Sequence, residues 1–468
     1  MSIIHDPVTG EAITEVADTD PTSLDRMLDE ARAAFPAWRR VPATERGALL
    51  RRCAGLMREH AEELAELEAR NTGKPITHTR GEVERAALAF EYYGGWADKH
   101  VGATIPVPGE YHTYTVPEPH GVVAGVIPWN VPYVFAALKV APALAFGNAI
   151  VLKPAPETPL SALRLAELVA EAGVPRGLVH VAVGGGEIGE RLVGDPRVDL
   201  VVFTGSHETG RAVARTAAER LTPVALELGG KNPQLVFADA DIDAAVDGIM
   251  LGAYSQCGQM CIAGTRILVE ERVYRDVVER VRERVRALRV GDPREEGVNV
   301  GPQTTAAQRD KTMSMIESAQ AEGVEVLAQA PVPDAPELAG GYFATPTAFV
   351  DAPVDSQIMQ EEVFGPVLGL RSFRDEAEAV ELANATSFGL AAGVWTGDVG
   401  RAHRVASEVD AGTVWINTYR VLSVLVPFGG FKLSGFGREG GQEAARLYTR
   451  IKSVWTSLDG GLPPGYRL

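Results

Sequence analysis

The stretch "GVVAGVIPWNVPYVFAALKVAPALAFGNAIVL", residues 121–152, decides the fold class because it allows two opposite interpretations. It carries a single charge, on Lys139, and an apolar run of more than about 20 residues is typical of a membrane-spanning helix. Three prolines interrupt the run, however, and Trp129-Asn130 lies between two of them. Because proline breaks a helix, the pattern predicts a buried strand, a turn and a core helix, and we expect no membrane segment.

From residue 121 onward, short apolar runs alternate with helical stretches. The runs read "GVVAGVI", "AIVLKP", "LVHVAV", "LVVFTG" and "PVALELGG". This alternation predicts a parallel sheet covered by helices on both faces, with ligands bound beyond the carboxyl ends of the strands. A second series begins near "PQLVFADADIDAA" and runs to about residue 430, so we place a domain boundary at the Gly229-Gly230 turn.

The two ends of the chain lie outside these series. The start "HDPVTGEAI" predicts a pair of strands, and apolar residues at helical spacing between Leu49 and Leu67 predict helical structure that ends at Gly73. Cys53 lies on that apolar stripe, so we expect it in the core. Near the C-terminus, "YTRIKSVWTSLDG" predicts a further strand.

Charge and composition exclude several classes of function. The 468 residues include 45 Lys and Arg against 62 Asp and Glu, and the net charge of −17 offers no electrostatic surface for nucleic acid or an anionic membrane. The N-terminus "MSIIHDPVTGEA" lacks the features of a signal peptide, and three cysteines cannot build a disulfide framework. We therefore expect a cytoplasmic protein.

Two of the three cysteines, Cys257 and Cys261, lie in "SQCGQMCIAG", residues 255–264. A structural zinc site needs four ligands, and no histidine lies close to this pair in the sequence, so we expect no metal. A disulfide between the two would close almost no loop, and the cytosol would keep it reduced. Each cysteine is therefore either a nucleophile or a core residue.

Two polar residues interrupt apolar runs elsewhere. Glu227 ends the apolar part of "PVALELGG", and because an unpaired buried carboxylate is costly, it should either find a partner or carry a raised pKa suited to proton transfer. Asn130 in "VIPWNVP" could donate hydrogen bonds to a developing oxyanion. With a cysteine, these residues would supply a nucleophile, a base and an oxyanion donor.

Seven motifs, in order along almost the whole chain, resemble those of the aldehyde dehydrogenase superfamily. They are "PWNVP" (128–132), "KPAPETPL" (153–160), "FTGSHETG" (203–210), "LELGGKNP" (226–233), "GQMC" (258–261), "EEVFGPV" (361–367) and "PFGGFKLSGFGRE" (427–439). Each motif alone is weak evidence, but seven in this order are specific.

The resemblance implies an α/β fold of three parts. These are a Rossmann-like dinucleotide-binding domain (1–100 and 120–228), an α/β catalytic domain (229–430) and a small β extension for oligomerisation (101–119 and 446–468). Because exposed edge strands invite pairing with another subunit, we expect a homodimer or a homotetramer.

The resemblance also implies a mechanism. Cys261 would be the catalytic thiol, Glu227 the general base and Asn130 the oxyanion stabiliser, which leaves Cys257 as a packed bystander. The thiolate would attack the aldehyde carbonyl, a hydride would pass to the nicotinamide, and water activated by Glu227 would hydrolyse the resulting thioester. Lys139 and Glu439 match positions that relay protons from Glu227.

The implied cofactor is NAD, with NADP possible. "LVVFTGSHETG" predicts a strand, a glycine turn and a helix, so Gly205, Ser206 and Gly210 would offer backbone donors to a pyrophosphate. Lys153 would reach the adenosine ribose and Glu362 the nicotinamide ribose. The remaining cofactor positions carried over from the resemblance are Ile127, Trp129, Pro156, Gly185, Gly189, Phe203, Leu228 and Phe364.

Two positions depart from the family pattern. Many members have a glutamate where this chain has Pro156, with Glu157 one step further on, and loss of that carboxylate removes a barrier against the 2′-phosphate of NADP. We therefore expect NAD as the main cofactor with real use of NADP. His207 replaces a frequent threonine and is either an extra donor or a surface residue.

The predicted aldehyde tunnel is apolar: its positions are Val131, Phe135, Leu138 and Phe428, and the loop "RVLSVLVPFGG" before it is apolar apart from Arg420 and Ser423. This composition favours an uncharged aliphatic or aromatic aldehyde over a semialdehyde carboxylate, which would need a dedicated arginine.

Other functions fit less well. Dehydrogenases that acylate coenzyme A typically lack the base equivalent to Glu227, because activated water would destroy their thioester. A non-catalytic scaffold protein would have lost the thiol, the base or the asparagine. A serine hydrolase would need a G-x-S-x-G motif, which this sequence lacks.

Overall fold

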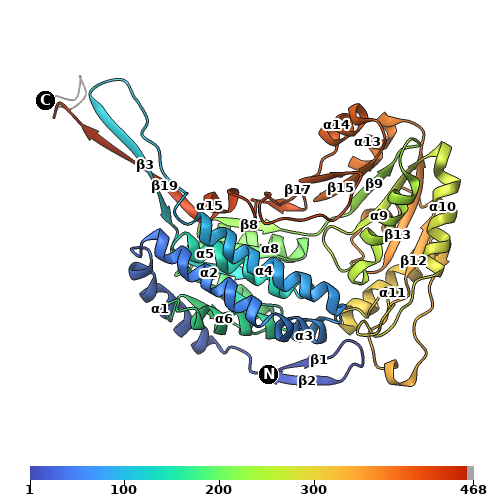
Figure 1. Ribbon diagram of the computed structural model, residues 1–468, viewed down its shortest axis with the longest axis horizontal. Coiled ribbons are helices and arrows are strands. Elements are labelled where there is room, and N and C mark those ends of the chain that lie inside the picture. The colour runs from blue at the N-terminus through green and yellow to red at the C-terminus, as the bar shows by residue number, and fades with distance from the viewer. Residues whose placement is uncertain (461–468) are drawn as a thin grey trace.

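The computed structural model describes residues 1–460 and contains two large sheets (Figure 1). The first has six strands in the order β18-β8-β7-β4-β5-β6, all parallel except β18, which runs antiparallel to β8. Its strands are β4 (Val122–Val126), β5 (Ala149–Lys153), β6 (Val179–Val181), β7 (Leu200–Thr204), β8 (Val224–Glu227) and β18 (Gly435–Phe436).

Helices connect the strands of this sheet and pack against it. They are α5 (Pro132–Ala145), α6 (Leu160–Glu171), α7 (Gly186–Gly194) and α8 (His207–Ala218). The stretch 121–152 folds as predicted, into strand β4, a turn, the buried helix α5 and strand β5. No helix among residues 1–460 has both the length and the apolar character needed to cross a membrane.

The N-terminal segment adds a layer of helices: α1 (Pro21–Trp38), α2 (Ala43–Glu59), α3 (Ala61–Thr72) and α4 (Ile76–Trp96). α2 and α4 pack on each other and on α5. The predicted helical stretch divides into α2 and α3 at His60 and ends at Gly73, whose φ of 74° is left-handed. Cys53 is fully buried in this layer, which confirms its expected place in the core.

The second sheet has seven strands in the order β11-β12-β13-β10-β9-β15-β16, parallel except for β11. Its strands are β9 (Asn232–Val236), β10 (Gly264–Glu270), β11 (Glu325–Gln329), β12 (Thr347–Val350), β13 (Val367–Phe373), β15 (Ala391–Trp395) and β16 (Thr413–Ile416). The accompanying helices are α9 (Ile242–Tyr254), η1 (Ser255–Gly258), α10 (Glu271–Arg286), α11 (Ala306–Ala321), η2 (Pro336–Leu338), α12 (Gln357–Gln360), α13 (Glu376–Asn384) and α14 (Val399–Glu408).

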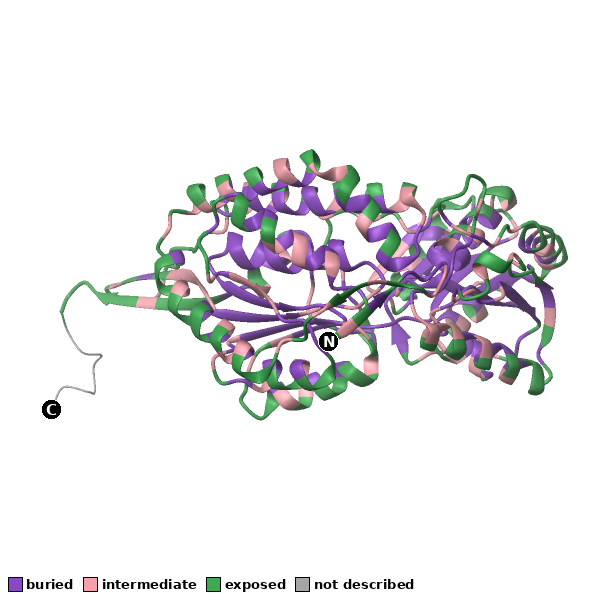
Figure 2. Ribbon diagram, turned by 90° about the horizontal axis from the view of Figure 1, so that it is seen from below, coloured by how far each residue is buried: buried purple, intermediate pink, exposed green. Residues whose placement is uncertain are grey.

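Both sheets are buried between helical layers, as the alternation of apolar runs predicts (Figure 2). β8 belongs to the first sheet and β9 to the second, and Gly229-Gly230 lies between them. We propose this turn as the domain boundary. The chain later returns to the first sheet, where β18 pairs with β8.

A two-stranded ribbon projects from the body of the molecule (Figure 1). β3 (Tyr111–Pro119) pairs antiparallel with β19 (Thr449–Ser457), the strand predicted near the C-terminus. The last part of the predicted extension, 461–468, lies outside the described residues. The remaining short elements are the predicted N-terminal pair β1 (Ser2–His5) and β2 (Ala12–Val16), the pair β14 (Phe388–Gly389) and β17 (Phe431–Lys432), and α15 (Glu443–Leu447).

Candidate active site

A single cavity brings together residues from both sheets. Its walls come from the turn between β4 and α5, the ends of β7 and β8, the segment after η1, the segment after α12 and the loop before β17. Ligands of open α/β sheets bind at this place, beyond the carboxyl ends of the strands. The predicted site residues in its wall are Trp129, Asn130, Val131, Phe135, Leu138, Gly205, Ser206, Glu227, Leu228, Cys261, Glu362, Phe364, Phe428 and Glu439.

The backbone before Cys261 is sharply bent. Gln256 and Cys257 have φ values of 53° and 56°, which are unusual for residues other than glycine, and Gly258 follows at 69°. A Cβ at Gly258 would lie 2.0 Å from the carbonyl oxygen of Gly365, so only glycine fits there. The bend carries Cys261 into the cavity wall.

The two neighbouring cysteines therefore have different surroundings. Cys257 is 1% exposed, packs in the core of the second sheet and receives a hydrogen bond at its Sγ from Nε2 of Gln303, at 3.3 Å. Cys261 is half-buried and lines the cavity. Burial, followed by the carboxylates of Glu362 and Glu227, raises the pKa of the Cys261 thiol to about 12.

Asn130, in the turn before α5, lines the same cavity as Cys261. Its Nδ2 donates to the backbone oxygen of Gln259 at 2.9 Å, and its Oδ1 is buried without a partner within residues 1–460. Because a side-chain amide nitrogen carries two N–H groups, one remains to donate to an oxygen in the cavity.

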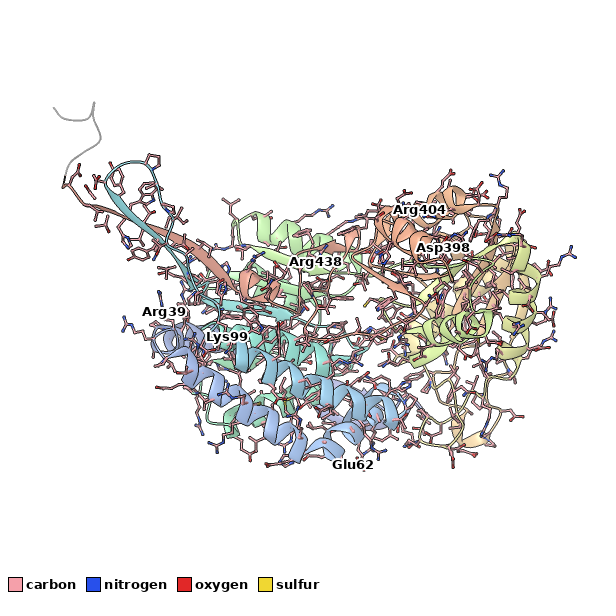
Figure 3. The ribbon with its side chains drawn as sticks, turned by 45° about the horizontal axis from the view of Figure 1, so that its top comes forward. Arg39, Glu62, Lys99, Asp398, Arg404 and Arg438 are labelled. Atoms are coloured by element: carbon pink, nitrogen blue, oxygen red, sulfur yellow. The ribbon has the colours of Figure 1, made fainter. Side chains whose placement is uncertain are left out.

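Glu227 is the last residue of β8 and is almost fully buried. Within the described part of the chain, neither of its carboxylate oxygens has a hydrogen-bond partner. Burial raises the pKa of Glu227 well above its ordinary value, the Glu439 carboxylate raises it further, and Lys139 and Arg438 oppose the shift. Arg438 is labelled in Figure 3, between the two halves of the molecule. These surroundings therefore favour the neutral, protonated form of Glu227 more than water does.

Lys139 and Glu439 form a buried ion pair beside Glu227. The ammonium of Lys139, on α5, contacts Oε1 of Glu439 and donates to Oγ1 of Thr204 at 2.7 Å. Thr204 is in turn the strand neighbour of Glu227. These contacts place the Lys139 ammonium, the Glu439 carboxylate and the Thr204 hydroxyl in a row next to Glu227. Such a row of groups can transfer a proton.

The turn after β7 does not offer donors in the way predicted. The N–H of Gly205 donates to the backbone oxygen of Glu227, and the N–H of Gly210 donates to that of Ser206, so the expectation that these glycines present free donors is wrong. A Cβ would lie 2.5 Å from Cζ of Phe203 at Gly205 and 2.6 Å from Cδ2 of Leu228 at Gly210, so a side chain at either position would push one of these groups aside. Ser206 is the N-cap of α8, and the helix N-terminus behind it favours an anion.

Trp129, Phe364 and Glu362 line the cavity between this helix and Cys261. The rings of Trp129 and Phe364 stand edge to face with centroids 5.3 Å apart. Oε1 of Glu362 accepts the N–H of Gly230 at 3.1 Å, and burial raises the pKa of Glu362 to about 7. A Cβ at Gly229 would lie 2.0 Å from Oε2 of Glu362, so this turn admits the carboxylate only because the residue is glycine.

Other predicted cofactor positions lie outside the cavity wall. Lys153 ends β5, is buried and donates to the backbone oxygen of Pro154, and burial lowers its pKa. Its side chain lies against the position of Gly189 on α7. Lys139, Ile127, Phe203, Gly210, Gly185 and Pro156 are likewise absent from the wall; Gly185 is the N-cap of α7, and Pro156 is half-buried.

His207 is also outside the cavity wall. Its ring pairs with Glu208 at 3.0 Å and stacks edge to face on Phe388. No grouping of His, Cys, Asp or Glu able to hold a metal ion occurs among residues 1–460.

The sequence did not reveal every residue of the wall. Val134, Met260, Ile262, Leu422, Val424 and Val426 extend its apolar surface, and three polar residues, Arg85, Gln308 and Lys311, join it from α4 and α11. No local signal in the sequence of α4 indicates that Arg85 lines the same cavity as Cys261.

Comparison with known proteins agrees with this geometry. The aldehyde dehydrogenase family model matches residues 2–454. The betaine aldehyde dehydrogenase of Sinorhizobium fredii is 44% identical over 454 residues, covering 97% of this chain and 93% of that protein. That of Cereibacter sphaeroides is 44% identical over 453 residues, with the same coverage of both chains.

Two solved structures superimpose closely. The betaine aldehyde dehydrogenase of Staphylococcus aureus, in complex with NAD+, has a TM-score of 0.96 and 38% identity and covers 98% of this chain and 92% of its own. PnpE from Pseudomonas sp. WBC-3 has a TM-score of 0.96 and 41% identity and covers 99% and 96%. The motifs, the fold and these matches together show that the chain belongs to the aldehyde dehydrogenase family.

Proposed function

We propose that this aldehyde-oxidising enzyme converts its substrate to the carboxylic acid by hydrolysis of a thioester on Cys261, with NAD as the main cofactor and NADP also used. The single observation that carries the proposal is the meeting of Cys261, Asn130 and an unpaired, buried Glu227 in one cavity wall. These groups are a nucleophile, an oxyanion donor and a base, and hydrolytic aldehyde oxidation needs all three.

Cys261 would capture the aldehyde. Its sulfur forms a bond to the carbonyl carbon, and the free N–H of Asn130 together with the backbone N–H of Cys261 stabilises the oxygen as it becomes an anion. The thiol must lose its proton first. The carboxylates of Glu227 and Glu362, whose charges act on this thiol, are the candidate acceptors.

The residues along the cavity fit a dinucleotide. The N-terminus of α8 suits a pyrophosphate, the glycines at 205 and 210 keep that approach open, and the Glu362 carboxylate could bind a ribose. When bound, NAD would take up the hydride that leaves the carbon attached to Cys261. Trp129 and Phe364 would then flank the nicotinamide end of the cavity.

Glu227 would activate the water that hydrolyses the thioester. Its raised pKa makes it a strong base once it has lost its proton, and both its oxygens are free to hold that water. The neighbouring pair Lys139–Glu439 could pass the proton away from the site. This base also argues against transfer of the acyl group to coenzyme A.

The wall near Cys261 indicates an apolar substrate body. Val131, Phe135, Leu138 and Phe428 all line the cavity, so an aliphatic or aromatic skeleton without charge next to the carbonyl suits it. The betaine aldehyde named for several relatives carries a quaternary ammonium, which proteins bind in aromatic cages. The wall here holds Phe135 and Phe428 but also Arg85, whose positive charge would repel that ammonium, so we expect betaine aldehyde to be a poor substrate.

The test is reduction of NAD or NADP, followed at 340 nm, with a panel of aldehydes and without coenzyme A. We expect turnover with wild type, and a loss of at least about a thousandfold for Cys261→Ala. Glu227→Gln should release one equivalent of reduced cofactor per site and then stall. Turnover only after addition of coenzyme A would contradict the hydrolytic mechanism, and silence with every aldehyde would favour a non-catalytic scaffold.

A further inference from the structure

Arg85 is an unpaired cation in the cavity wall. It lies on α4, is half-buried and lines the cavity together with Val134, Leu138 and Leu422. Within residues 1–460 it has no hydrogen bond and no ion pair. The other cation of the wall, Lys311, is different, because it donates to the backbone oxygen of Glu362 at 3.4 Å. Removing a guanidinium from water without a partner is costly, so we expect an anion to bind beside Arg85.

No neighbouring carboxylate is available to pair with Arg85. Glu82, one turn earlier on α4, uses Oε1 to accept from Nε2 of Gln256 at 2.6 Å and Oε2 to pair with the buried Lys74. Lys74 also binds Glu68 at 3.2 Å. Glu84, next to Arg85 in the chain, points to the other side of the helix, where it pairs with Arg58 at 2.8 Å.

A second guanidinium increases the positive charge at this place. Arg420, in the loop before β17, donates only to neutral acceptors, Oε1 of Gln256 at 3.0 Å and the backbone oxygen of Leu251 at 3.2 Å. It is close enough to Arg85 for the two charges to repel. The imidazole of His78, on the same face of α4, is neutral: burial and these cations lower its pKa to about 4. The carboxylate of Glu82 attracts Arg420, but its two oxygens are bonded to Gln256 and Lys74, so it pairs directly with neither guanidinium.

We infer that Arg85 binds a carboxylate at the far end of the aldehyde, so that the preferred substrates are carboxylated aldehydes with an apolar chain or ring between the two groups. Guanidinium and carboxylate match in shape and charge, and such a pair is strongest where water is partly excluded. Arg420 reinforces the positive potential that attracts the anion. The inference rests on the proposed function and narrows it, and it differs from the uncharged aldehyde that the sequence favours.

The experiment compares matched pairs of aldehydes that differ only in the distal carboxylate. The pairs are succinic semialdehyde and butanal, adipic semialdehyde and hexanal, suberic semialdehyde and octanal, and 4-carboxybenzaldehyde and benzaldehyde. For each pair, kcat/KM of the carboxylate is divided by kcat/KM of the neutral aldehyde. The measurement is made on wild type, Arg85→Met, Arg85→Lys and the control Arg275→Met, which removes an exposed, unpaired arginine from α10.

We expect at least one pair to give a ratio above about tenfold in wild type, because a hydrogen-bonded charge pair contributes that much discrimination. Arg85→Met should lower that ratio by about tenfold or more, Arg85→Lys should lower it less, and Arg275→Met should leave it unchanged. The pair with the highest ratio reports the separation between Cys261 and Arg85.

Two results would overturn the inference alone: a wild-type preference for the neutral aldehyde in every pair, or a ratio that survives Arg85→Met. Absence of Cys261-dependent turnover with all eight aldehydes and with betaine aldehyde would instead overturn the proposed function, and this inference with it. Neutral aldehydes are measured in parallel, so a variant that fails to fold loses activity with both aldehydes of each pair and gives no interpretable ratio. Its circular dichroism spectrum identifies such a variant. In that case the ratio measured for Arg85→Lys tests the inference.

Discussion

At the scale of the residue, Cys257 and Cys261 lie only four positions apart in the chain but in different environments. Cys257 is packed in the core beside Gln303, whereas Cys261 lines the cavity. Sequence reasoning from the residues alone left both a nucleophile and a core role open for each. Only the left-handed backbone at Gln256 and Cys257 explains why one thiol turns inward and the other faces the substrate.

We predict that alkylation separates the two thiols. Iodoacetamide should react with Cys261 first, because the sulfur of Cys257 is 1% exposed and that of Cys53 is fully buried. Peptide mass spectrometry after partial inactivation should find the label on Cys261 in proportion to lost activity. Cys257→Ala should retain turnover while lowering the melting temperature through the cavity it leaves. Label on Cys257 at equal rate would contradict the packing described here.

The raised pKa of Glu227 predicts how activity depends on pH. Only the ionised carboxylate can accept a proton, so kcat should rise as the pH rises through the raised pKa. Glu439, Lys139, Arg438 and the Cys261 thiol all face this carboxylate and set its ionisation together. The rate of thioester hydrolysis, measured with a preformed acyl-enzyme, should therefore climb as the pH rises through the raised pKa of Glu227. A flat profile between mildly acidic and alkaline pH would contradict this assignment.

The raised pKa of Glu227 also predicts how the stability of the fold depends on pH. A carboxyl group with a pKa above its ordinary value of 4.5 stabilises the fold while it is protonated, and that contribution is lost as the pH rises through the folded-state pKa. Glu227→Gln cannot ionise, so the variant should gain in melting temperature relative to wild type as the pH rises. Thermal unfolding of the two proteins across this range is the direct comparison.

At the scale of the element, we propose that the turn after β5 influences the choice between NAD and NADP. Lys153 ends the strand buried, Pro156 is half-buried and the carboxylate of Glu157 is exposed to solvent. The carboxylate that many relatives place at position 156 is therefore replaced by an uncharged ring. Nothing in this turn repels a 2′-phosphate as strongly as that carboxylate would.

We predict that Pro156→Glu lowers the activity with NADP relative to the activity with NAD. The new carboxylate would lie in the turn beside Lys153, so kcat/KM with NADP should fall by at least about tenfold, the effect of one like-charge contact. Activity with NAD should change much less. Glu157→Gln serves as the matched control, because it alters the charge of the exposed neighbour. A wild-type preference for NAD already above about a thousandfold, or roughly 4 kcal/mol, would rule out real use of NADP.

At the scale of the whole molecule, the ribbon of β3 and β19 stands away from the body (Figure 1). Apolar side chains on this ribbon are exposed to solvent. Ile451 is 61% exposed and Trp455 is 60% exposed. Exposed strand edges and apolar groups of this kind are typical of a surface that another subunit covers. This supports the expected homodimer or homotetramer.

We predict that Ile451→Glu combined with Trp455→Glu lowers the molar mass in solution. Light scattering should show wild type as a dimer or a tetramer and the double variant as a smaller species, because two carboxylates on the ribbon oppose apolar burial. Val399→Glu, at an exposed site on α14, is the control for added charge elsewhere. A monomeric wild type would contradict the role of the ribbon.

The sequence by itself predicted the five parallel strands of the first sheet and the helix end at Gly73, and it pointed to the three central residues as candidates. Alternating apolar runs fix strands and helices through local periodicity, and Asn130 and Glu227 were visible because each interrupts such a run. The resemblance of seven motifs then assigned Cys261. All of these signals are local, so they survive without knowledge of the packing.

Only the tertiary structure decided which distant residues meet. The Lys139–Glu439 pair joins residues 300 positions apart, β18 returns to pair with β8, and the N–H groups of Gly205 and Gly210 are consumed by backbone carbonyls instead of being free for a ligand. Arg85 belongs to the same group, since its place in the same cavity wall as Cys261 depends on how α4 packs on α5. Local periodicity indicates which face of a helix is buried. Which charges meet across a cavity depends on the packing of whole segments, and no local pattern of the sequence encodes that packing.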